Sequence, residues 1–333
     1  MVTIRRAGEA DEQSMRNLFA LCFSREMSHD EWYWKYVLSP WGTVAYVGCA
    51  TRQSDAAEPD AIVSHFGGIR CAFEMHGKRL CAYQFCDVCT HPGYRGRIFG
   101  SKPPVMRSAE TFYAEREMDF AFGFPSERHA RLHCLVLEST YGKVALFRKE
   151  FSAKRYVASP MAGLNLLRLQ EGWRGFFDGE LDDLWMTNTL KPPLTISKGE
   201  AYLRWRYQGH PTKKYDVFAW RGLLRRTIRY LAITKMKGDE LQVLDFFSTV
   251  GGKPIDSCRR VLALLESLAR DRGAAALALW LNPGEPLAGL LSGHGYIATD
   301  GIPLALKALH PQIMDAGSFY GNYGYRMGDY DDS

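Results

Sequence analysis

One short motif occurs twice in this chain and constrains its fold more than any other feature. The motif is a tryptophan, a basic residue and a tyrosine, with a proline four positions further on, and its copies span residues 34–40 and 205–211. After each copy the same series follows: a strand-like run, two hydrophobic runs, a helical run and a strand-like run that ends in proline. These runs are 44–48, 62–73, 80–88, 105–117 and 119–125 in the first copy, and 215–220, 227–234, 241–250, 257–272 and 276–283 in the second. The series predicts a duplicated α/β unit.

The length of the chain agrees with a duplication. A chain of 333 residues is too long for one ordinary core and fits two domains of about 150 residues each. Glycine and proline are frequent between the two copies, which is typical of a connector. We predict a first domain at 1–159, a connector at 160–197, a second domain at 198–310 and a tail rich in glycine, tyrosine and aspartate at 311–333.

The turn between the predicted strand 80–88 and the predicted helix 105–117 is basic and contains glycine. Glycines allow close approach of the backbone, and the N-terminus of a helix adds about half a positive charge. Such a turn is a candidate anion-binding site, and pyrophosphate is the expected ligand. An ordinary basic surface turn is the alternative.

This turn resembles the acyl-coenzyme A loop of the GNAT N-acyltransferase superfamily. His91-Pro92, Tyr94, Arg95 and Gly100 match the superfamily pattern, whereas Ile98 stands where the family prefers glycine. The resemblance implies a mixed α/β chain of two tandem GNAT-like domains, each a mixed, mostly antiparallel sheet flanked by helices. It also implies acetyl-CoA or another acyl-CoA as co-substrate. The residues implied to bind it are Val88, Cys89, Tyr94, Arg95, Gly96, Arg97, Ile98, Phe99, Gly100, Ser101 and Lys102.

The resemblance also extends to the second half, which lacks two of the family's features. The second loop, 248–254, has no arginine comparable to Arg95, and Leu291 stands where the family's tyrosine protonates the departing thiolate. In the first half Glu138 takes that tyrosine's place, and Tyr141 lies three residues further on. We therefore expect one acyl-CoA site, in the first domain.

The implied chemistry requires a base that removes a proton from the attacking amine and an acid that serves the thiolate. Asp87, Glu138 and His65 are the candidate bases, and Tyr141 is the candidate acid. Each has an ordinary alternative: a strand-end carboxylate, a solvated helix face, a hydrogen-bonded strand histidine and a core tyrosine, respectively.

Composition favours a soluble protein that binds a small anionic molecule. The net charge is +5 with basic and acidic residues interspersed, which fits a small polyanion better than a nucleic acid. No apolar run is long enough to span a membrane, and the N-terminus lacks a signal-peptide pattern, so we expect a cytoplasmic protein. Among eight cysteines, Cys86 and Cys89 have metal spacing but no second such pair follows, so we predict no metal.

The repeated motif and the terminal Gly-Asp-x-Asp at 328–331 resemble tandem GNAT proteins of bacterial surface-sugar pathways, which acylate nucleotide-linked amino sugars. The implied function is transfer of a short acyl group to a primary amine of a small polar acceptor. The aromatic tail is expected to fold back and shape the acceptor pocket, with Asp329 or Asp331 bonded to the acceptor. Two alternatives are a catalytically silent acyl-CoA sensor or scaffold and an aminoacyl-tRNA-dependent peptidoglycan-precursor transferase. The acceptor, the acyl length and the oligomeric state, including a homodimer, stay open.

Overall fold

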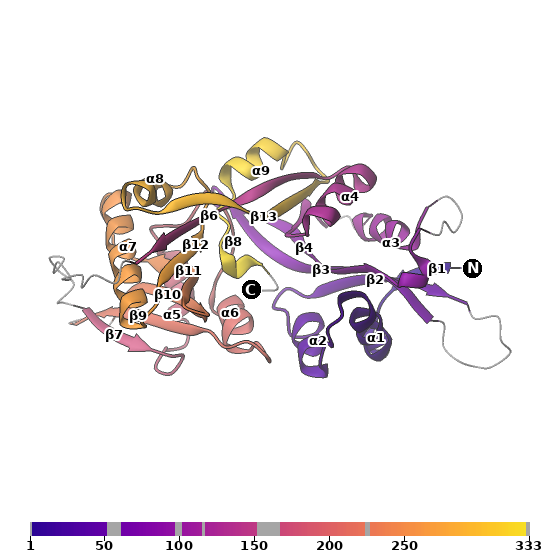
Figure 1. Ribbon diagram of the computed structural model, residues 1–333, viewed down its shortest axis with the longest axis horizontal. Coiled ribbons are helices and arrows are strands. Elements are labelled where there is room, and N and C mark those ends of the chain that lie inside the picture. The colour runs from indigo at the N-terminus through magenta and orange to yellow at the C-terminus, as the bar shows by residue number, and fades with distance from the viewer. Residues whose placement is uncertain are drawn as a thin grey trace.

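The computed structural model describes residues 2–51, 61–96, 102–114, 117–151, 167–223 and 227–330. Its centre is a mixed, mostly antiparallel sheet that runs through both halves of an elongated molecule (Figure 1). Within the described residues the sheet has 13 strands, in the order β1-β2-β3-β4-β5-β13-β6-β12-β11-β10-β9-β7, with β8 paired to β3. The α/β class predicted from the sequence is confirmed.

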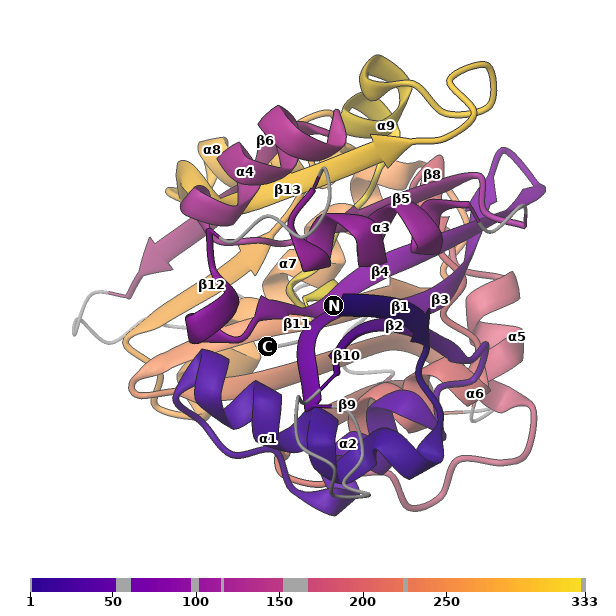
Figure 2. The ribbon, with the colours of Figure 1, turned by 90° about the vertical axis from the view of Figure 1, so that its right-hand side faces the viewer.

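The first half supplies the strands from β1 to β6 and the helices from α1 to α4. Helices α1 and α2 cover one face of β2–β4, and α3 and α4 lie on the opposite side (Figures 1 and 2). The strands are β1 (Val2–Arg6), β2 (Thr43–Ala50), β3 (Ala61–Met75), β4 (Lys78–Thr90), β5 (Phe120–Gly123) and β6 (Thr140–Glu150). The helices are α1 (Glu12–Phe23), α2 (His29–Tyr36), α3 (Pro104–Tyr113) and α4 (Glu127–Leu137).

The second half repeats this series and adds short elements before it. The strands are β7 (Leu167–Glu171), β8 (Leu194–Ile196), β9 (Asp216–Gly222), β10 (Ile228–Lys237), β11 (Glu240–Ser248), β12 (Ala276–Trp280) and β13 (Ile297–Ala308). The helices are α5 (Glu180–Met186), α6 (Glu200–Leu203), α7 (Pro254–Asp271), α8 (Pro286–Gly293) and α9 (Ala316–Asn322). In α7 the predicted apolar stripe, Val261 to Leu268, is buried against the sheet.

The last strand of each repeat pairs across the molecule. Strand β6 lies between β13 and β12, and β13 lies between β5 and β6. The two halves therefore share one continuous sheet. Strand β8, within the predicted connector, pairs with β3 of the first half. The boundary between 159 and 160 lies outside the described residues, and the division into two domains stays a prediction.

The two copies of the repeated motif face each other at the centre of the molecule. The rings of Trp34 and Trp205 stack with centroids 4.8 Å apart. Trp34 donates its indole N–H to the carbonyl oxygen of Trp205 over 2.8 Å, and Trp205 donates to the carbonyl oxygen of Trp34 over 2.9 Å. This reciprocal pair joins the end of α2 to the helical turn Arg204–Gln208.

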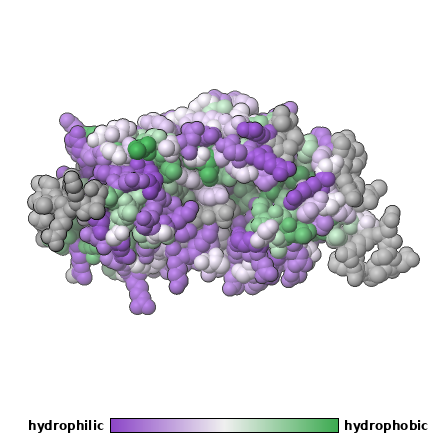
Figure 3. All heavy atoms as spheres, in the orientation of Figure 1, coloured by the Kyte–Doolittle hydropathy of each residue, from purple (hydrophilic) through white to green (hydrophobic). Residues whose placement is uncertain are grey.

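The tail folds back onto both halves, as its aromatic content predicts. Phe319, Tyr323 and Tyr325 are buried in the central core cluster, beside strands of both halves. Figure 1 places the described C-terminal end between the halves. The face drawn in Figure 3 is mostly hydrophilic with small apolar patches. Among helices of the described ranges, none has the length and apolar content to cross a membrane.

Candidate functional site

A cleft opens where β4 and β5 stop pairing. The two strands run parallel only from the Ala82–Phe120 pair to the Gln84–Phe122 pair. Beyond it β4 continues along β3, while the chain after β5 turns into α4. The cleft has a volume of about 480 Å³, which is in the range of small-molecule sites. Its lining residues are Phe19, Phe23, Arg25, Lys35, Gln84, Phe85, Cys86, Asp87, Val88, Phe124, Pro125, Ser126, His129 and Tyr330.

A β-bulge in β4 places Asp87 at this cleft. The β3–β4 register shifts between the His65–Cys89 pair and the Gly67–Cys86 pair, so that β4 carries one extra residue there. Asp87 has a φ of 51°, a left-handed conformation that aspartate adopts more readily than most residues. Because a bulge interrupts the ladder, backbone groups beside Asp87 are released from strand pairing.

The Asp87 side chain is the centre of a buried polar cluster. Its carboxylate accepts hydrogen bonds from the Tyr36 hydroxyl at 2.6 Å and from Lys35 Nζ at 3.0 Å. His65 Nδ1 lies 2.8 Å from the Asp87 carbonyl oxygen, so this nitrogen carries the proton and donates. Burial lowers the pKa of His65 and raises the pKa of Tyr36. At neutral pH the cluster therefore holds a neutral imidazole, a protonated phenol and a carboxylate paired with Lys35.

The structure separates the four predicted catalytic residues. Asp87 lines the cleft, and His65 lies behind it, 3 % exposed and bound to the Asp87 backbone. Glu138 has a φ of 52° at the end of α4, which turns its side chain into solvent, 3.6 Å from Lys307. Tyr141 lies on β6, paired with Ala305 and 41 % exposed. Neither Glu138 nor Tyr141 lines the cleft, so the structure brings only Asp87 and His65 together.

The predicted acyl-CoA loop follows directly from this cluster. Val88 lines the cleft, and Cys89 pairs with His65 one residue before the end of β4. Tyr94 closes the short helical turn Pro92–Tyr94, and Arg95 Nε donates to the Thr90 carbonyl oxygen over 3.1 Å. Gly96 has a φ of 71°, which favours glycine. Lys102 forms an ion pair with Glu110 on α3. Arg97, Ile98, Phe99, Gly100 and Ser101 lie outside the described residues.

Sequence reasoning missed His129 and Tyr330, which both line the cleft. His129 lies in the first turn of α4. Burial, followed by the positive charges of Arg128 and Arg95, lowers its pKa, so the imidazole is neutral at physiological pH. No histidine grouping in the sequence pointed to it. Tyr330 was noticed only as part of the aromatic tail. Asp329, one of the two predicted acceptor contacts, is 1 % exposed and ion-paired to Lys198, so it does not face the cleft. The other, Asp331, lies outside the described residues.

The family comparison agrees with this geometry. Residues 3–130, which carry β4, the loop and β5, match the model of the acetyltransferase (GNAT) domain family. This match covers less than half of the chain and marks the first half as similar to that family. No curated protein sequence matches the chain.

Solved structures extend the likeness to the whole fold. A conserved Enterococcus faecalis V583 protein, described as a probable N-acyltransferase, is 12 % identical, with 94 % of this chain and 74 % of that chain covered and a TM-score of 0.68. A GCN5-related N-acetyltransferase from Anabaena variabilis is 13 % identical, with 92 % and 73 % covered and a TM-score of 0.62.

Saccharomyces cerevisiae N-myristoyltransferase with bound myristoyl-CoA is 8 % identical, with 91 % and 82 % covered and a TM-score of 0.54. At such identities the likeness shows the fold. Together with the family match of the first half, these neighbours show a GNAT-like fold.

Proposed function

We propose that this protein transfers a short acyl group, such as acetyl, from acyl-CoA to the primary amine of a small polar acceptor. The observation that carries the proposal is the cleft at the divergence of β4 and β5, with Asp87 at its β4 side and Val88 leading into the loop. The thioester would lie along β4 beside the bulge. Arg95 and the loop that follows it would hold the pyrophosphate.

The polar groups of the cleft fit the proton transfers of this reaction. As the acceptor nitrogen attacks the thioester carbonyl, one N–H proton must leave it, and the departing thiolate must gain one. His129, a neutral imidazole, can take the first proton and return it to the thiolate. Asp87, held in place by Lys35 and Tyr36, can hold the amine by charge and hydrogen bonding. Backbone N–H groups released at the bulge can stabilise the oxyanion.

The lining also supports an amino sugar as the acceptor class. Phe124 and Tyr330 offer aromatic faces, and Gln84 and Ser126 offer hydrogen-bonding groups in the same cleft. Aromatic faces beside polar groups suit the apolar face and hydroxyls of a sugar ring. The attachment of a nucleotide to that sugar rests on the resemblance of the repeated motif and the terminal Gly-Asp-x-Asp alone.

Release of free coenzyme A tests the proposal. The full chain is incubated with acetyl-CoA and, separately, glucosamine, ethanolamine, lysine and spermidine, and the free thiol is titrated. We expect release with at least one amine, and a loss of about 10²-fold or more in Asp87→Asn. The exposed Asp300→Asn, in a surface ion pair with Lys143, serves as control and should match the parent.

Three outcomes would change the assignment. Binding of acetyl-CoA without release of thiol for any amine would favour the sensor or scaffold. Full activity in Asp87→Asn would remove Asp87 from the reaction. Loss of activity in Glu138→Gln would return the role of base to the sequence-based candidate Glu138.

A further inference from the structure

The second half repeats the opening that forms the cleft in the first. Strands β11 and β12 pair in parallel from Glu240–Ala276 to Val243–Leu279. Beyond this pair β11 continues to Ser248, while the chain after β12 turns into α8. The duplication therefore produces a second place where two parallel strands diverge.

The chain's own tail fills this second opening. The helical turn Met327–Asp329 packs against β11. A Cβ atom at Gly328 would lie 3.0 Å from the Leu244 carbonyl oxygen and 2.9 Å from an Asp245 carboxylate oxygen, and would overlap the Tyr207 hydroxyl. Only glycine fits so close to β11. The opening that corresponds to the cleft is thus occupied by protein.

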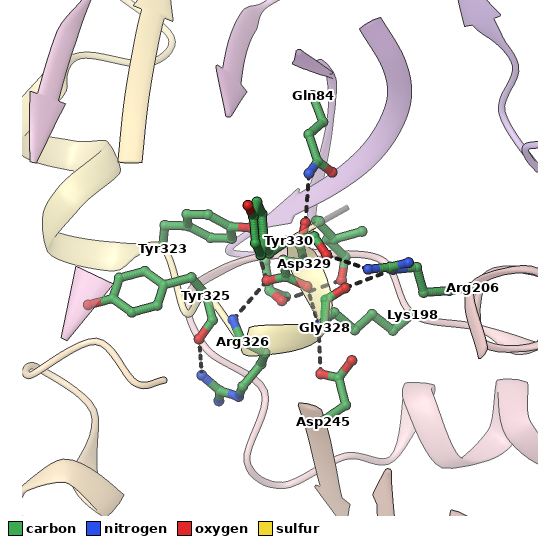
Figure 4. Close-up of polar contacts among 12 residues, drawn as sticks. Gln84, Lys198, Arg206, Asp245, Tyr323, Tyr325, Arg326, Gly328, Asp329 and Tyr330 are labelled. Carbon is green, nitrogen blue, oxygen red and sulfur yellow. Dashed lines mark hydrogen bonds and ion pairs between the residues drawn. The ribbon is translucent and has the colours of Figure 1, made fainter. Parts of the chain in front are cut away.

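A buried cluster of charges holds the tail there (Figure 4). Lys198 Nζ lies 2.6 Å from Asp245 Oδ1 and 2.5 Å from Asp329 Oδ1, and all three side chains are 2 % exposed or less. The other Asp329 oxygen accepts from the Tyr323 hydroxyl at 3.0 Å and from the Arg326 backbone N–H at 2.9 Å. We call Lys198, Asp245 and Asp329 the tail anchor.

The tail continues from this anchor into the first half. Gln84, which lines the cleft, donates its side-chain amide to the Asp329 carbonyl oxygen over 2.7 Å. Arg206 donates to the carbonyl oxygens of Gly328 and Tyr330. The Tyr330 ring then packs beside both Phe124 and Trp280, with centroids 5.9 Å and 6.0 Å away, and lines the cleft.

A buried ion cluster is a poor device for stability alone, because desolvation of the charges offsets much of their attraction. Such a cluster is better suited to holding a segment of the chain in one defined position. We propose that the tail anchor is a positioning device: it seats residues 326–330 in the second opening so that Tyr330 forms a wall of the cleft and determines which acceptor fits. This inference rests on the proposed function of the cleft.

A double-mutant cycle separates positioning from general stability. The probe is the amine that gives the fastest thiol release in the panel above. We expect Tyr330→Ala to raise the acceptor KM at least fivefold and to leave the dissociation constant of acetyl-CoA unchanged. Asp329→Asn should raise the acceptor KM in the same direction. Because the anchor acts through Tyr330, the double variant should have the KM of Tyr330→Ala.

Two results would overturn the inference: an unchanged acceptor KM in Tyr330→Ala, or additive effects of the two substitutions. Hydrogen exchange gives a readout independent of activity. In Asp329→Asn the amides of 326–330 should exchange faster while those of β11 keep their protection. Equal hydrogen-exchange rates of the tail amides in the parent and in Asp329→Asn would show that the tail anchor does not hold the tail in place. This result is informative even if no amine is acylated. If Asp329→Asn does not fold, Tyr330→Ala and Tyr330→Phe still test Tyr330 as a wall of the cleft. The rise in acceptor KM should be smaller in Tyr330→Phe, which keeps the aromatic ring.

Discussion

At the scale of single residues, Asp87 shows how one position combines backbone strain, charge and burial. Its left-handed backbone belongs to the bulge that interrupts the β3–β4 ladder, and its carboxylate is held by Lys35 and Tyr36 beside the cleft. Backbone strain of this kind costs of order 1–3 kcal/mol and persists where the surroundings fix it. The strain and the contacts together support a role for Asp87 in the reaction.

His129 gives a prediction on pH dependence. Burial and the neighbouring Arg128 and Arg95 lower its pKa, so the basic form dominates above its ordinary value of about 6.5. If His129 accepts the proton, kcat/KM should fall only as the pH drops below that value. His129→Gln should lower kcat by about 10²-fold or more and remove this acid limb. The measurement is kcat/KM from pH 5 to 9, with Asp300→Asn as control.

The groups that face the cleft with His129 are Arg25, Lys35, Asp87 and Tyr330. Asp87→Asn is measured alongside, because Asp87 lines the same cleft. An acid limb that survives in His129→Gln would contradict the role of His129.

The tail anchor gives a prediction on stability. Lys198→Met leaves Asp245 and Asp329 buried without their cation, which should lower the free energy of unfolding by about 3–5 kcal/mol at pH 7. Burial and Asp329 already raise the pKa of Asp245. When the folded-state pKa of a carboxyl group is raised, the free energy of unfolding falls as the pH rises through that pKa. The loss of unfolding free energy in Lys198→Met should therefore be smaller at pH 5 than at pH 7.

A matched control exists at the surface. Lys143 also lies between two carboxylates, those of Glu127 and Asp300, but is 39 % exposed. Lys143→Met should change the free energy of unfolding by less than about 1 kcal/mol. Urea denaturation of both variants at pH 5 and 7 measures the difference. Equal effects of the two substitutions would show that burial of the anchor contributes nothing.

At the scale of elements, the sequence predicted most strands and helices and the order in which they repeat. The helical stripe of α7 and the strand runs of β4 and β11 follow from hydrophobic periodicity alone. The pairing of β6 with β12 and of β13 with β5 could not be predicted, because an alternating hydrophobic pattern identifies a strand but not the strand that it pairs with. The position of Glu138 could not be predicted for a related reason: sequence spacing does not reveal the turn after α4 that points its side chain to solvent.

The repeated motif gives a prediction at this scale. Trp205 stacks on Trp34 and donates to its carbonyl oxygen, and Trp34 is 2 % exposed. Trp205→Ala should therefore lower the free energy of unfolding by about 3–5 kcal/mol. The double variant with Trp34→Ala should lose less than the sum, since the two rings share one contact. A stable Trp205→Ala protein that has lost acceptor turnover would instead place these residues in the substrate site.

At the scale of the whole molecule, the opening between β4 and β5 differs from the opening between β11 and β12. The first is an open cleft beside the predicted loop, and the second holds Gly328 and Asp329. We therefore predict that coenzyme A binds with a stoichiometry of one per chain in isothermal titration. Gly100→Glu should abolish binding by placing bulk and negative charge against the pyrophosphate. A stoichiometry of two, or normal binding by Gly100→Glu, would contradict this assignment.

The shared sheet makes the halves interdependent. Strand β6 of the first half pairs with β12 and β13, and β5 pairs with β13. The tail then buries Phe319 and Tyr323 in a core that both halves line. A fragment of residues 1–159 would expose the edges of β5 and β6 and leave that core incomplete. We therefore predict that neither 1–159 nor 160–333 folds when expressed alone.

Cleavage of the folded protein tests whether each half needs only the presence of the other half or also a covalent link to it. A protease site is inserted between 159 and 160 and the folded protein is treated with the protease; the two pieces should then stay together through strand pairing and the common core. We expect the cut protein to co-elute as one species in size-exclusion chromatography and to keep its affinity for acetyl-CoA. Fragment 1–159 alone should show no cooperative thermal transition. If it unfolds cooperatively and binds acetyl-CoA with the affinity of the full chain, the first half is a self-sufficient domain and the exchange of strands is dispensable.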